Sequence, residues 1–426
     1  MTMRVLGIFV LLSLPLAAAD EARLALSLKA QTEFERVDLS GMARLEDAGQ
    51  CVQSQAAALA VAPPADAALL HYRKGFCMLA GAAATGRASE YNDAAAELEK
   101  AIEAWPARIS PSQAKKGVVE PVSPALRVLV AIAHLKAGGD TASADRARKE
   151  LQSATSAPVC AADVMTPASC QQIVAKGRDW LGWMALKSGD LREATRNFAA
   201  STGAWPDWAA GQKAFADGNY RAAADRERSA IRRWEAERRD TPPRLLDSFG
   251  PHVDWADALT DWGGAQLLAG DEAGAIATLD RAAHEDPTLA RPLYLRARAK
   301  EIAGDATGAM NDYNLASRTA FAAAQDLASG EAHLYRGILL YRRKDWERAE
   351  NEFSSALNFA IPATLRPDAE AWRHLAAVAG GSCEASRAYL ERSLEAVSPY
   401  FPKAEARAVA ANCSTHTAGL RGPEGN

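Results

Sequence analysis

The side chains that could do chemistry do not gather into a catalytic or metal-binding pattern. No two of the seven histidines stand four residues apart on one predicted helix, as a metal-binding pair would. The chain also lacks the Gly-x-Ser-x-Gly elbow of a hydrolase and a glycine-rich phosphate loop. Asp254, Asp257 and Asp261 recur along one predicted helix, but a cation loop also needs backbone carbonyl ligands from a turn. We therefore expect a solvated acidic face there, and a non-enzyme without cofactor or metal.

The cysteines are the reactive groups with an informative spacing. They fall as three neighbouring pairs: Cys51 with Cys77, Cys160 with Cys170, and Cys383 with Cys413. Each pair lies within or beside one predicted helical hairpin, where antiparallel helices can bring Cβ atoms to the ~4 Å that a disulfide needs. No Cys-x-x-Cys occurs, which disfavours zinc. Three disulfides are expected, with six reduced, buried cysteines as the alternative if the chain is not exported.

The first 19 residues have the order of a secretory signal peptide. Arg4 precedes the apolar run 5–16, and three alanines, 17–19, supply small residues for cleavage before Asp20. The run is short for a stable bilayer span of about 20 residues, although a retained N-terminal anchor is the alternative. No later segment is continuously apolar over about 18 residues. We expect a periplasmic or secreted protein, and the Ala, Arg and Gly bias hints at a bacterial source.

The composition favours a helical array over a nucleic-acid-binding protein. The 426 residues carry 49 basic and 53 acidic side chains, a net charge of −4, whereas nucleic acid favours a basic excess. Hydrophobic residues make up 48% but aromatic residues only 7%, so the apolar content is largely Ala with Leu, Val and Ile. Such helices form readily and pack closely. This length suits repeats, because each repeat adds its own layer of core.

A helical-hairpin pattern recurs along the chain and is clearest over residues 175–208. Gly182 lies on the first predicted helix, Gly189 in the turn, and Ala194 and Phe198 on the second helix. Because Gly182 and Ala194 are small, the two helices can cross closely, while Phe198 fills the space to the next pair. Gly189 is expected in the left-handed conformation that ends a helix. Looser units place these residues on corresponding first helices: Gly75, Ala131, Gly211, Gly263, Ala297, Gly337 and Trp372.

This pattern resembles the tetratricopeptide repeat, a helix–turn–helix unit of about 34 residues. The resemblance implies an all-α solenoid of antiparallel helix pairs, with a generic Ala-rich bundle as the alternative. The expected divisions are a signal peptide (1–19), an N-terminal helical cap with a first hairpin (20–107), a repeat block (124–236), a linker (237–254), a second repeat block (255–400) and a disordered tail (414–426).

The resemblance also implies where a partner binds, because ligands of this family contact first-helix residues on the concave side. The corresponding candidates are Trp183, Lys187, Trp208, Phe215, Arg291, Tyr294, Arg298 and Tyr341. Exposed aromatic side chains are common binding anchors. Arg291 and Arg298 beside Tyr294 could hold a carboxylate or a backbone carbonyl. The alternative is packing between repeats for the aromatic residues and solvation for the arginines.

Some members of this family grip acidic C-terminal peptides with a clamp of Lys, Asn and Arg. Here Asp179 and Trp183 stand at corresponding positions, which argues against that ligand. The leading hypothesis is an exported scaffold that binds a protein or an extended peptide through its concave first-helix surface, without nucleic acid and without a membrane span after cleavage. The alternative is a module that holds envelope glycans or polymers for an enzyme or export complex, with Trp183, Trp208 and Tyr294 stacking on sugar rings.

Overall fold

The chain is built from helices throughout the part that the structure describes. The computed structural model describes residues 6–37, 41, 44–105, 122–138, 141–156, 158, 160, 166–201, 203–239, 245–398 and 401–419. No β-strand occurs in these ranges, so the predicted all-α fold is confirmed.

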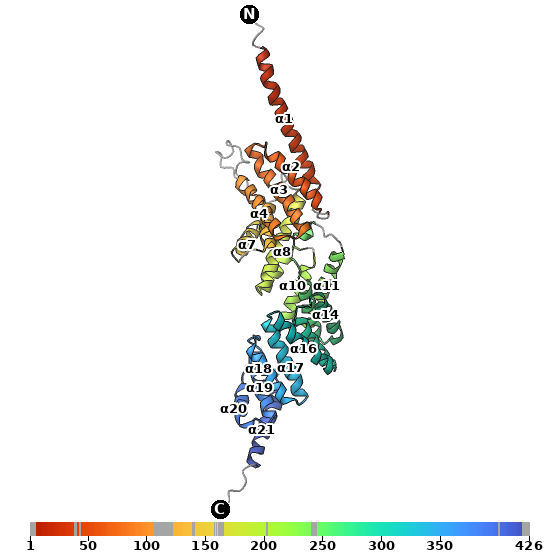
Figure 1. Cartoon of the computed structure of the whole chain (residues 1–426), viewed down its shortest axis with the longest axis vertical. Coiled ribbons are helices and arrows are strands. Elements are labelled where there is room, and N and C mark those ends of the chain that lie inside the picture. The colour runs from red at the N-terminus through yellow and green to blue at the C-terminus, as the bar shows by residue number, and fades with distance from the viewer. Residues whose placement is uncertain are drawn as a thin grey trace, which may run out of the picture. The chain divides into compact units, whose positions relative to one another are not determined.

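The described helices are labelled in Figure 1 where there is room. They are α1 (Leu6–Glu35), α2 (Leu45–Leu59), α3 (Pro64–Thr85), α4 (Ala88–Ala104), α6 (Pro124–Ala137), α7 (Thr141–Ser156), α8 (Pro167–Lys187), α9 (Leu191–Phe198), α10 (Trp205–Ala216), α11 (Tyr220–Arg239), α12 (Leu245–Ser248), α13 (Trp255–Leu268), α14 (Glu272–Glu285), α15 (Arg291–Ile302), α16 (Ala306–Ala322), α17 (Asp326–Arg342), α18 (Trp346–Asn358), α19 (Arg366–Ala379), α20 (Cys383–Ser393) and α21 (Lys403–Gly419).

The chain divides into two compact units. Unit 1 comprises Met1–Lys213 and Ser229–His252, and unit 2 comprises Ala214–Arg228 and Val253–Asn426. The expected linker, 237–254, overlaps the end of α11 and contains α12, while residues 240–244 of it lie outside the described ranges.

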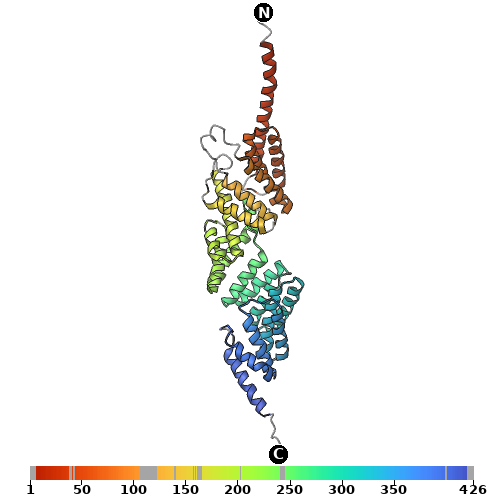
Figure 2. The same cartoon turned by 90° about the vertical axis from the view of Figure 1, so that its left-hand side faces the viewer.

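Each unit stacks consecutive helices into antiparallel pairs. In unit 1, α3 packs on α4, α6 on α7, and α8 on α9. In unit 2, α13 packs on α14, α15 on α16, α17 on α18, and α19 on α20, and Figure 2 shows these helices following one another from green to blue. We call the leading member of each pair its first helix and the other its second helix. This succession of pairs is the predicted solenoid architecture.

The turns of three pairs, α8–α9, α13–α14 and α15–α16, follow from a repeated Gly-Asp dipeptide. Gly189 has a φ of 79°, a left-handed conformation that a residue with a Cβ atom rarely adopts. Asp190 then caps α9, because its side chain accepts a hydrogen bond of 2.9 Å from the Glu193 backbone N–H. The same arrangement recurs between α15 and α16, where Gly304 has a φ of 88° and Asp305 is the cap. Each turn therefore ends one helix and starts the next.

Glycine on the first helix allows its second helix to come close. A Cβ atom placed on Gly182 would lie 2.7 Å from the ring of Phe198. The same holds for Gly337 against Phe353, at 2.6 Å. Both phenylalanines are completely buried. The small-against-large pairing inferred from the sequence is thus the packing contact inside the repeats.

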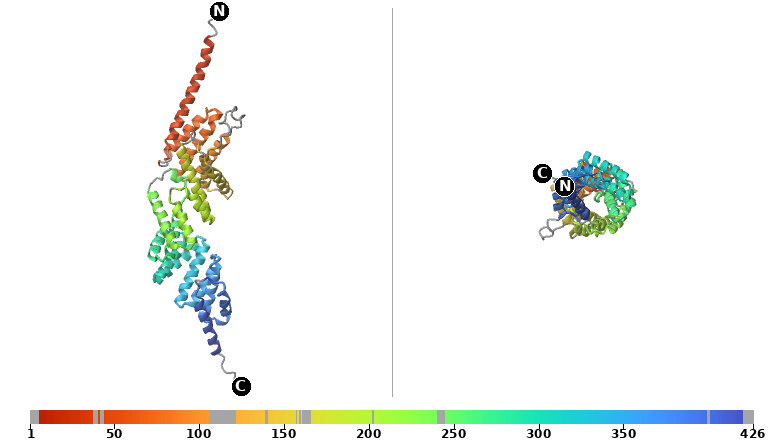
Figure 3. Two further views of the ribbon diagram at one scale, coloured as in Figure 1. Left: turned by 180° about the vertical axis from the view of Figure 1, so that it is seen from behind. Right: turned by 90° about the horizontal axis from the view of Figure 1, so that it is seen from below.

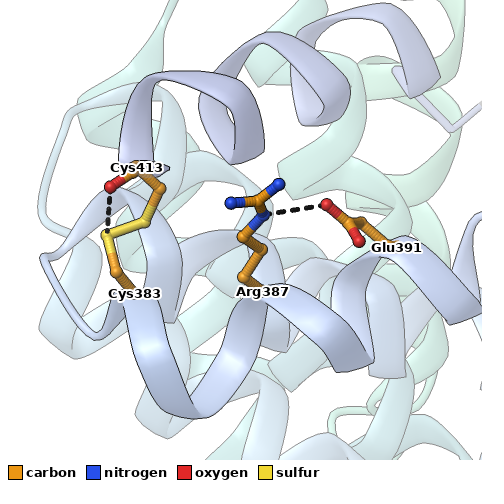
Figure 4. The surroundings of a disulfide bond; sticks show 4 residues. All are labelled: Cys383, Arg387, Glu391 and Cys413. Atoms are coloured by element: carbon orange, nitrogen blue, oxygen red, sulfur yellow. Dashed lines mark hydrogen bonds and ion pairs between the residues drawn. A yellow bond between two sulfur atoms is a disulfide. The ribbon is translucent and has the colours of Figure 1, made fainter. Parts of the chain in front are cut away.

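The six cysteines lie in the three predicted pairs, each at disulfide-bonding distance. The Cα atoms are 6.0 Å apart for Cys51–Cys77 and 5.7 Å apart for both Cys160–Cys170 and Cys383–Cys413. Figure 4 shows the last pair joining the start of α20 to α21, near an ion pair on α20 between Arg387 and Glu391. Because that bridge ties α21 to the last repeat, it holds the helix that ends the stack of unit 2.

Helix α1 runs through the expected cleavage point before Asp20. Its C-terminal part packs on α2 and α3 of the same unit, where Phe34 meets Phe76 edge-on at 5.6 Å and the Ala30 carbonyl accepts a 2.6 Å hydrogen bond from Gln55. Its N-terminal part extends beyond the neighbouring helices (Figure 1). Among the described residues, no helix has both the length and the apolar character that a bilayer span requires.

The C-terminal helix continues further than the sequence pattern indicates. α21, dark blue in Figure 3, packs on α19 and α20 and ends at Gly419. It therefore overlaps the expected tail 414–426, of which residues 420–426 lie outside the described ranges.

Candidate functional site

The first helices of unit 2 form one continuous surface. α13 contacts α15, α15 contacts α17, and α17 contacts α19. Ion pairs bridge neighbours, from Arg291 on α15 to Asp261 on α13 and from Arg342 on α17 to Glu301 on α15. We call this the first-helix surface of unit 2 and define it by Asp261, Leu268, Arg291, Arg298, Glu301, Ile302, Glu331, Tyr335 and Arg342.

Two predicted contact residues, Tyr294 and Tyr341, lie beneath this surface, with only 4% and 6% of their areas exposed. The hydroxyl of Tyr294 donates to Glu331, and that of Tyr341 donates to Glu405 on α21 at 3.0 Å. Burial and these carboxylates raise the pKa of both hydroxyls far above the ordinary value, so both remain protonated. The two tyrosines join neighbouring helices and offer little area to a partner.

Arg298 differs from the other arginines of this surface, because it has no carboxylate partner among the described residues. Its guanidinium lies 4.1 Å from the centroid of the Tyr335 ring. A guanidinium stacked by its face keeps its N–H edges for a carbonyl or a carboxylate. One turn further along α15, Ile302 is 57% exposed. The surface can therefore hold a polar group and an apolar group next to each other.

Arg291 and Arg298 both lie on α15, about two turns apart, and their surroundings differ. Arg291 is paired with Asp261, whereas Arg298 stacks on Tyr335. Tyr335 and Ile302 are not among the contact residues predicted from the sequence. Ile302 has a signal in the sequence, because it follows Arg298 by four residues on one helix.

In unit 1 the predicted residues Trp183 and Lys187 form a contact of their own on α8. The Lys187 ammonium lies 5.6 Å from the centroid of the half-buried Trp183 ring. Trp183 also meets Trp180 edge-on at 5.5 Å and packs on the hydrophobic core. One part of the Trp183 ring thus packs on the core, and the Lys187 side chain contacts a further part.

Trp208 and Phe215 on α10 do not join either group. Trp208 is 8% exposed and contacts Trp234 on α11 at 5.3 Å. Phe215 is half-buried and meets Tyr220 edge-on at 5.4 Å. Trp208 is a packing residue between helices, as the alternative interpretation of the aromatic residues predicts.

The first helices of unit 1 are covered by a segment of the chain itself. Phe249, which follows α12, is completely buried and meets Phe76 of α3 edge-on at 6.0 Å. Its carbonyl accepts a 2.8 Å hydrogen bond from the indole N–H of Trp180 on α8. Leu245 of α12 is 1% exposed. This stretch lies within the linker expected from the sequence, although its apolar residues are a signal of packing.

A small charged cluster lies beside this segment. Lys176 of α8 reaches Asp247 of α12 at 3.6 Å and Asp179 of α8 at 3.9 Å. Burial raises the pKa of Asp179 to about 6, against the opposing influence of Lys176. Burial, with the neighbouring charge of Lys176, lowers the pKa of Lys136 to about 8. Asp179, which the family pattern placed among ligand contacts, is therefore a buried residue, 3% exposed.

The aspartates that recur at the start of α13 have separate roles. The Asp254 side chain caps α13 by accepting a 3.1 Å hydrogen bond from the Asp257 backbone N–H, while Asp261 pairs with Arg291. No group of three or more potential metal ligands lies together in the described part of the chain.

No protein-family model matches the chain, and no curated protein does. Solved structures are similar to it at low identity. MamA is 12% identical over 52% of this chain and 98% of its own, with a TM-score of 0.30. Yeast Tom70 is 11% identical over 95% of this chain and 98% of its own, with a TM-score of 0.39. The hetero-tetramer Cut9–Hcn1 of the APC/C is 12% identical over 93% of this chain and 88% of that chain, with a TM-score of 0.33.

Proposed function

We propose that this protein, with its tetratricopeptide-like helix pairs, is an exported scaffold that holds a protein or an extended peptide on the first-helix surface of unit 2. The observation that carries the proposal is Arg298, a cation without a carboxylate partner among the described residues, one helical turn from the exposed Ile302. A peptide supplies both complements, a backbone carbonyl or carboxylate for Arg298 and an apolar side chain for Ile302.

The charge of this surface favours a nearly neutral partner segment. Its three arginines, at 291, 298 and 342, are matched in number by three acidic residues, at 261, 301 and 331. Such a balanced surface gives no strong long-range attraction for an acidic tail or for nucleic acid. Recognition would therefore rest on local hydrogen bonds and on apolar contact.

Export is supported by two independent features of the chain. The N-terminal residues have the order of a cleavable signal peptide, and three cysteine pairs lie at disulfide-bonding distance. Disulfides persist in oxidising compartments such as the bacterial periplasm. We place the protein in the periplasm or outside the cell.

Capture from an envelope extract tests the proposal. Arg298→Gln combined with Ile302→Ser should lose the partners that the parent protein retains. Arg348→Gln serves as the matched control, because Arg348 is an exposed arginine on the second helix α18. Equal recovery of every partner by the parent and the double variant would contradict binding at this surface.

The glycan-holding alternative receives less support from the same side chains. Of the three aromatic residues that would stack on sugar rings, Trp208 and Tyr294 are buried, and Trp183 is half-buried. We expect no binding of polysaccharides to the full chain on a glycan array, and binding that Trp183→Ala abolishes would favour the alternative.

A further inference from the structure

Unit 2 also holds a pocket whose lining residues differ from those of the first-helix surface. It is an open hollow lined by the C-terminal half of α16, the first three turns of α17 and the residue that follows α18. The side chains that matter for its chemistry are Arg318, Phe321, Ser329, His333, Arg336 and Phe359. None of these residues belongs to the surface assigned to the scaffold function.

Gly330 allows the pocket to form. A Cβ atom at this position would collide with the carbonyl oxygen of Ala360 and with Ile361, so the N-terminal part of α17 can approach the chain after α18 only because the residue is glycine. This approach places Phe359 against α17, where its ring stacks on His333 with centroids 5.4 Å apart. The neighbouring Ser329 is 1% exposed, and its hydroxyl has no hydrogen-bond partner among the described residues.

Of the two arginines that line the pocket, Arg336 is paired with a carboxylate and, in the described part of the chain, Arg318 is not. Arg336 donates from Nε to Glu352 at 2.7 Å and from Nη1 to Asn314 at 2.9 Å, and His333 contacts the same carboxylate at 2.7 Å. Although burial raises the pKa of Glu352, hydrogen bonds from His333 and Arg336 outweigh it and lower the pKa, so the carboxylate is ionised and balances Arg336. Arg318 is exposed and has no acidic partner among the described residues.

The apolar part of the pocket includes a side chain that is largely exposed. Phe321 is 78% exposed, the largest exposed fraction among the large hydrophobic side chains of the described residues. Phe321 and Phe359 both line the pocket. Strongly hydrated anions such as phosphate gain little from such rings, whereas an apolar group buries their area from water.

We propose that this pocket binds an apolar organic carboxylate. Arg318 is the one arginine of the pocket without an acidic partner among the described residues, and a guanidinium pairs with a carboxylate through two parallel N–H donors. The apolar body of the ligand contacts Phe321 and Phe359. Two sources share this chemistry, a small aryl or alkyl acid and the free C-terminal carboxylate of a chain that ends in an apolar residue.

Isothermal titration of the full chain with 3-phenylpropionate tests the proposal, with 3-phenylpropanol as the uncharged analogue and inorganic phosphate as the hydrophilic anion. We expect the acid to bind and the other two compounds not to bind. Arg318→Gln should lower the affinity for the acid by about 10-fold or more. Phe321→Ala should also weaken binding. Arg348→Gln, on the exposed side of α18, should leave it unchanged.

Each outcome decides for or against the pocket. The proposal would be overturned if the acid gave no heat of binding at millimolar concentration, or if the acid and the alcohol bound with equal affinity. Binding of phosphate alone, or full affinity of Arg318→Gln for the acid, would overturn it as well. A peptide ending in Leu-Phe, tested with a free and with an amidated C-terminus, separates the two sources. Tighter binding of the free-acid peptide than of phenylpropionate identifies a chain end, and the reverse order identifies a small acid.

Discussion

Asp179 shows how burial sets the properties of single residues in this protein. Its carboxylate is 3% exposed and one of its oxygens has no hydrogen-bond partner among the described residues, while Lys176 lies 3.9 Å from the other. Burial disfavours the charged form, and Lys176 together with a hydrogen bond from Ser201 offsets only part of the penalty, which leaves the pKa at about 6. The residue therefore carries a cost to stability at neutral pH that a neutral side chain of the same shape avoids.

We predict that Asp179→Asn stabilises the protein at neutral pH and loses this advantage in acid. The folded-state pKa lies above the ordinary 3.8, so the folded chain binds the proton more tightly than the unfolded chain. Stability of the parent should fall as the pH rises from about 4 to about 6, with a ceiling of about 3 kcal/mol for the whole shift. Urea unfolding at pH 4, 6 and 8 measures the difference between variant and parent.

Asp280→Asn is the matched control for that series, because its side chain is 72% exposed and it also pairs with a basic residue, Arg296. A stability difference between Asp179→Asn and the parent that stays constant across the three pH values would contradict the buried-charge explanation.

At the scale of the elements, close helix contacts decide which glycines are required. Gly263 and Gly264 are neighbours on α13 but face different surroundings. A Cβ atom on Gly263 would lie 2.7 Å from Leu279 Cδ2 of α14, whereas one on Gly264 would find only Leu295 Cδ1, at 3.7 Å. The first position is a helix crossing and the second has room for a methyl group.

We predict opposite effects for two adjacent substitutions. Gly263→Ala should lower the free energy of unfolding by about 1–3 kcal/mol, because the added methyl forces α13 and α14 apart. Gly264→Ala should be neutral or stabilising by up to about 1 kcal/mol, because alanine favours helix. Chemical denaturation of both variants measures the effects, and equal effects would show that this crossing does not depend on a glycine.

The α12 segment is the second feature that belongs to this scale. Phe249→Ala removes a completely buried ring from contact with Phe76, and we predict a loss of about 3–5 kcal/mol of stability. The Trp180 indole beside it should gain contact with water, which shifts its fluorescence to longer wavelength. Phe321→Ala, at a 78% exposed position, should change stability little. Equal destabilisation by both substitutions would contradict a covering role for this segment.

At the scale of the whole molecule, two disulfide bonds link neighbouring helices near the ends of the helical array. Cys51–Cys77 fastens α2 to α3, and Cys383–Cys413 fastens the last repeat to α21. Terminal elements of a solenoid have a neighbour on one side only, so they gain less from packing than internal repeats. Disulfides near the ends therefore constrain the helices that gain the least stability from packing.

We predict that protein recovered from an oxidising compartment begins at Asp20 and has no free thiol. Mass spectrometry of the intact chain, together with thiol titration after denaturation without reductant, measures both. Protein made in a reducing cytoplasm is the control, with six titratable thiols expected. Six free thiols in the exported protein would contradict the disulfides, and an intact Met1 would indicate a retained anchor.

Much of the fold could be predicted from the sequence because its determinants are local. Gly189 ends a helix by its own conformation, and Asp190 starts the next through its own side chain. A small residue and a large one, such as Gly182 and Phe198, recur at a fixed spacing, because the large side chain must fill the space where the two helices of a pair cross. The cysteine pairing could also be predicted, because each pair lies close in sequence within or beside one hairpin.

Which residues remain available to a partner was decided by the tertiary structure. Trp183 and Tyr294 lie on first helices and Trp208 lies on α10, and the three differ in burial because of what packs on them. Trp208 is covered by α11, Tyr294 donates to Glu331 of the next repeat, and the first helices of unit 1 are covered by Phe249. A repeat pattern records the spacing within a hairpin, whereas burial depends on contacts between hairpins and on segments that lie outside the pattern. For that reason the sequence by itself determined an array of helix pairs, and only the packing between them singled out Arg298 and the pocket beside Arg318.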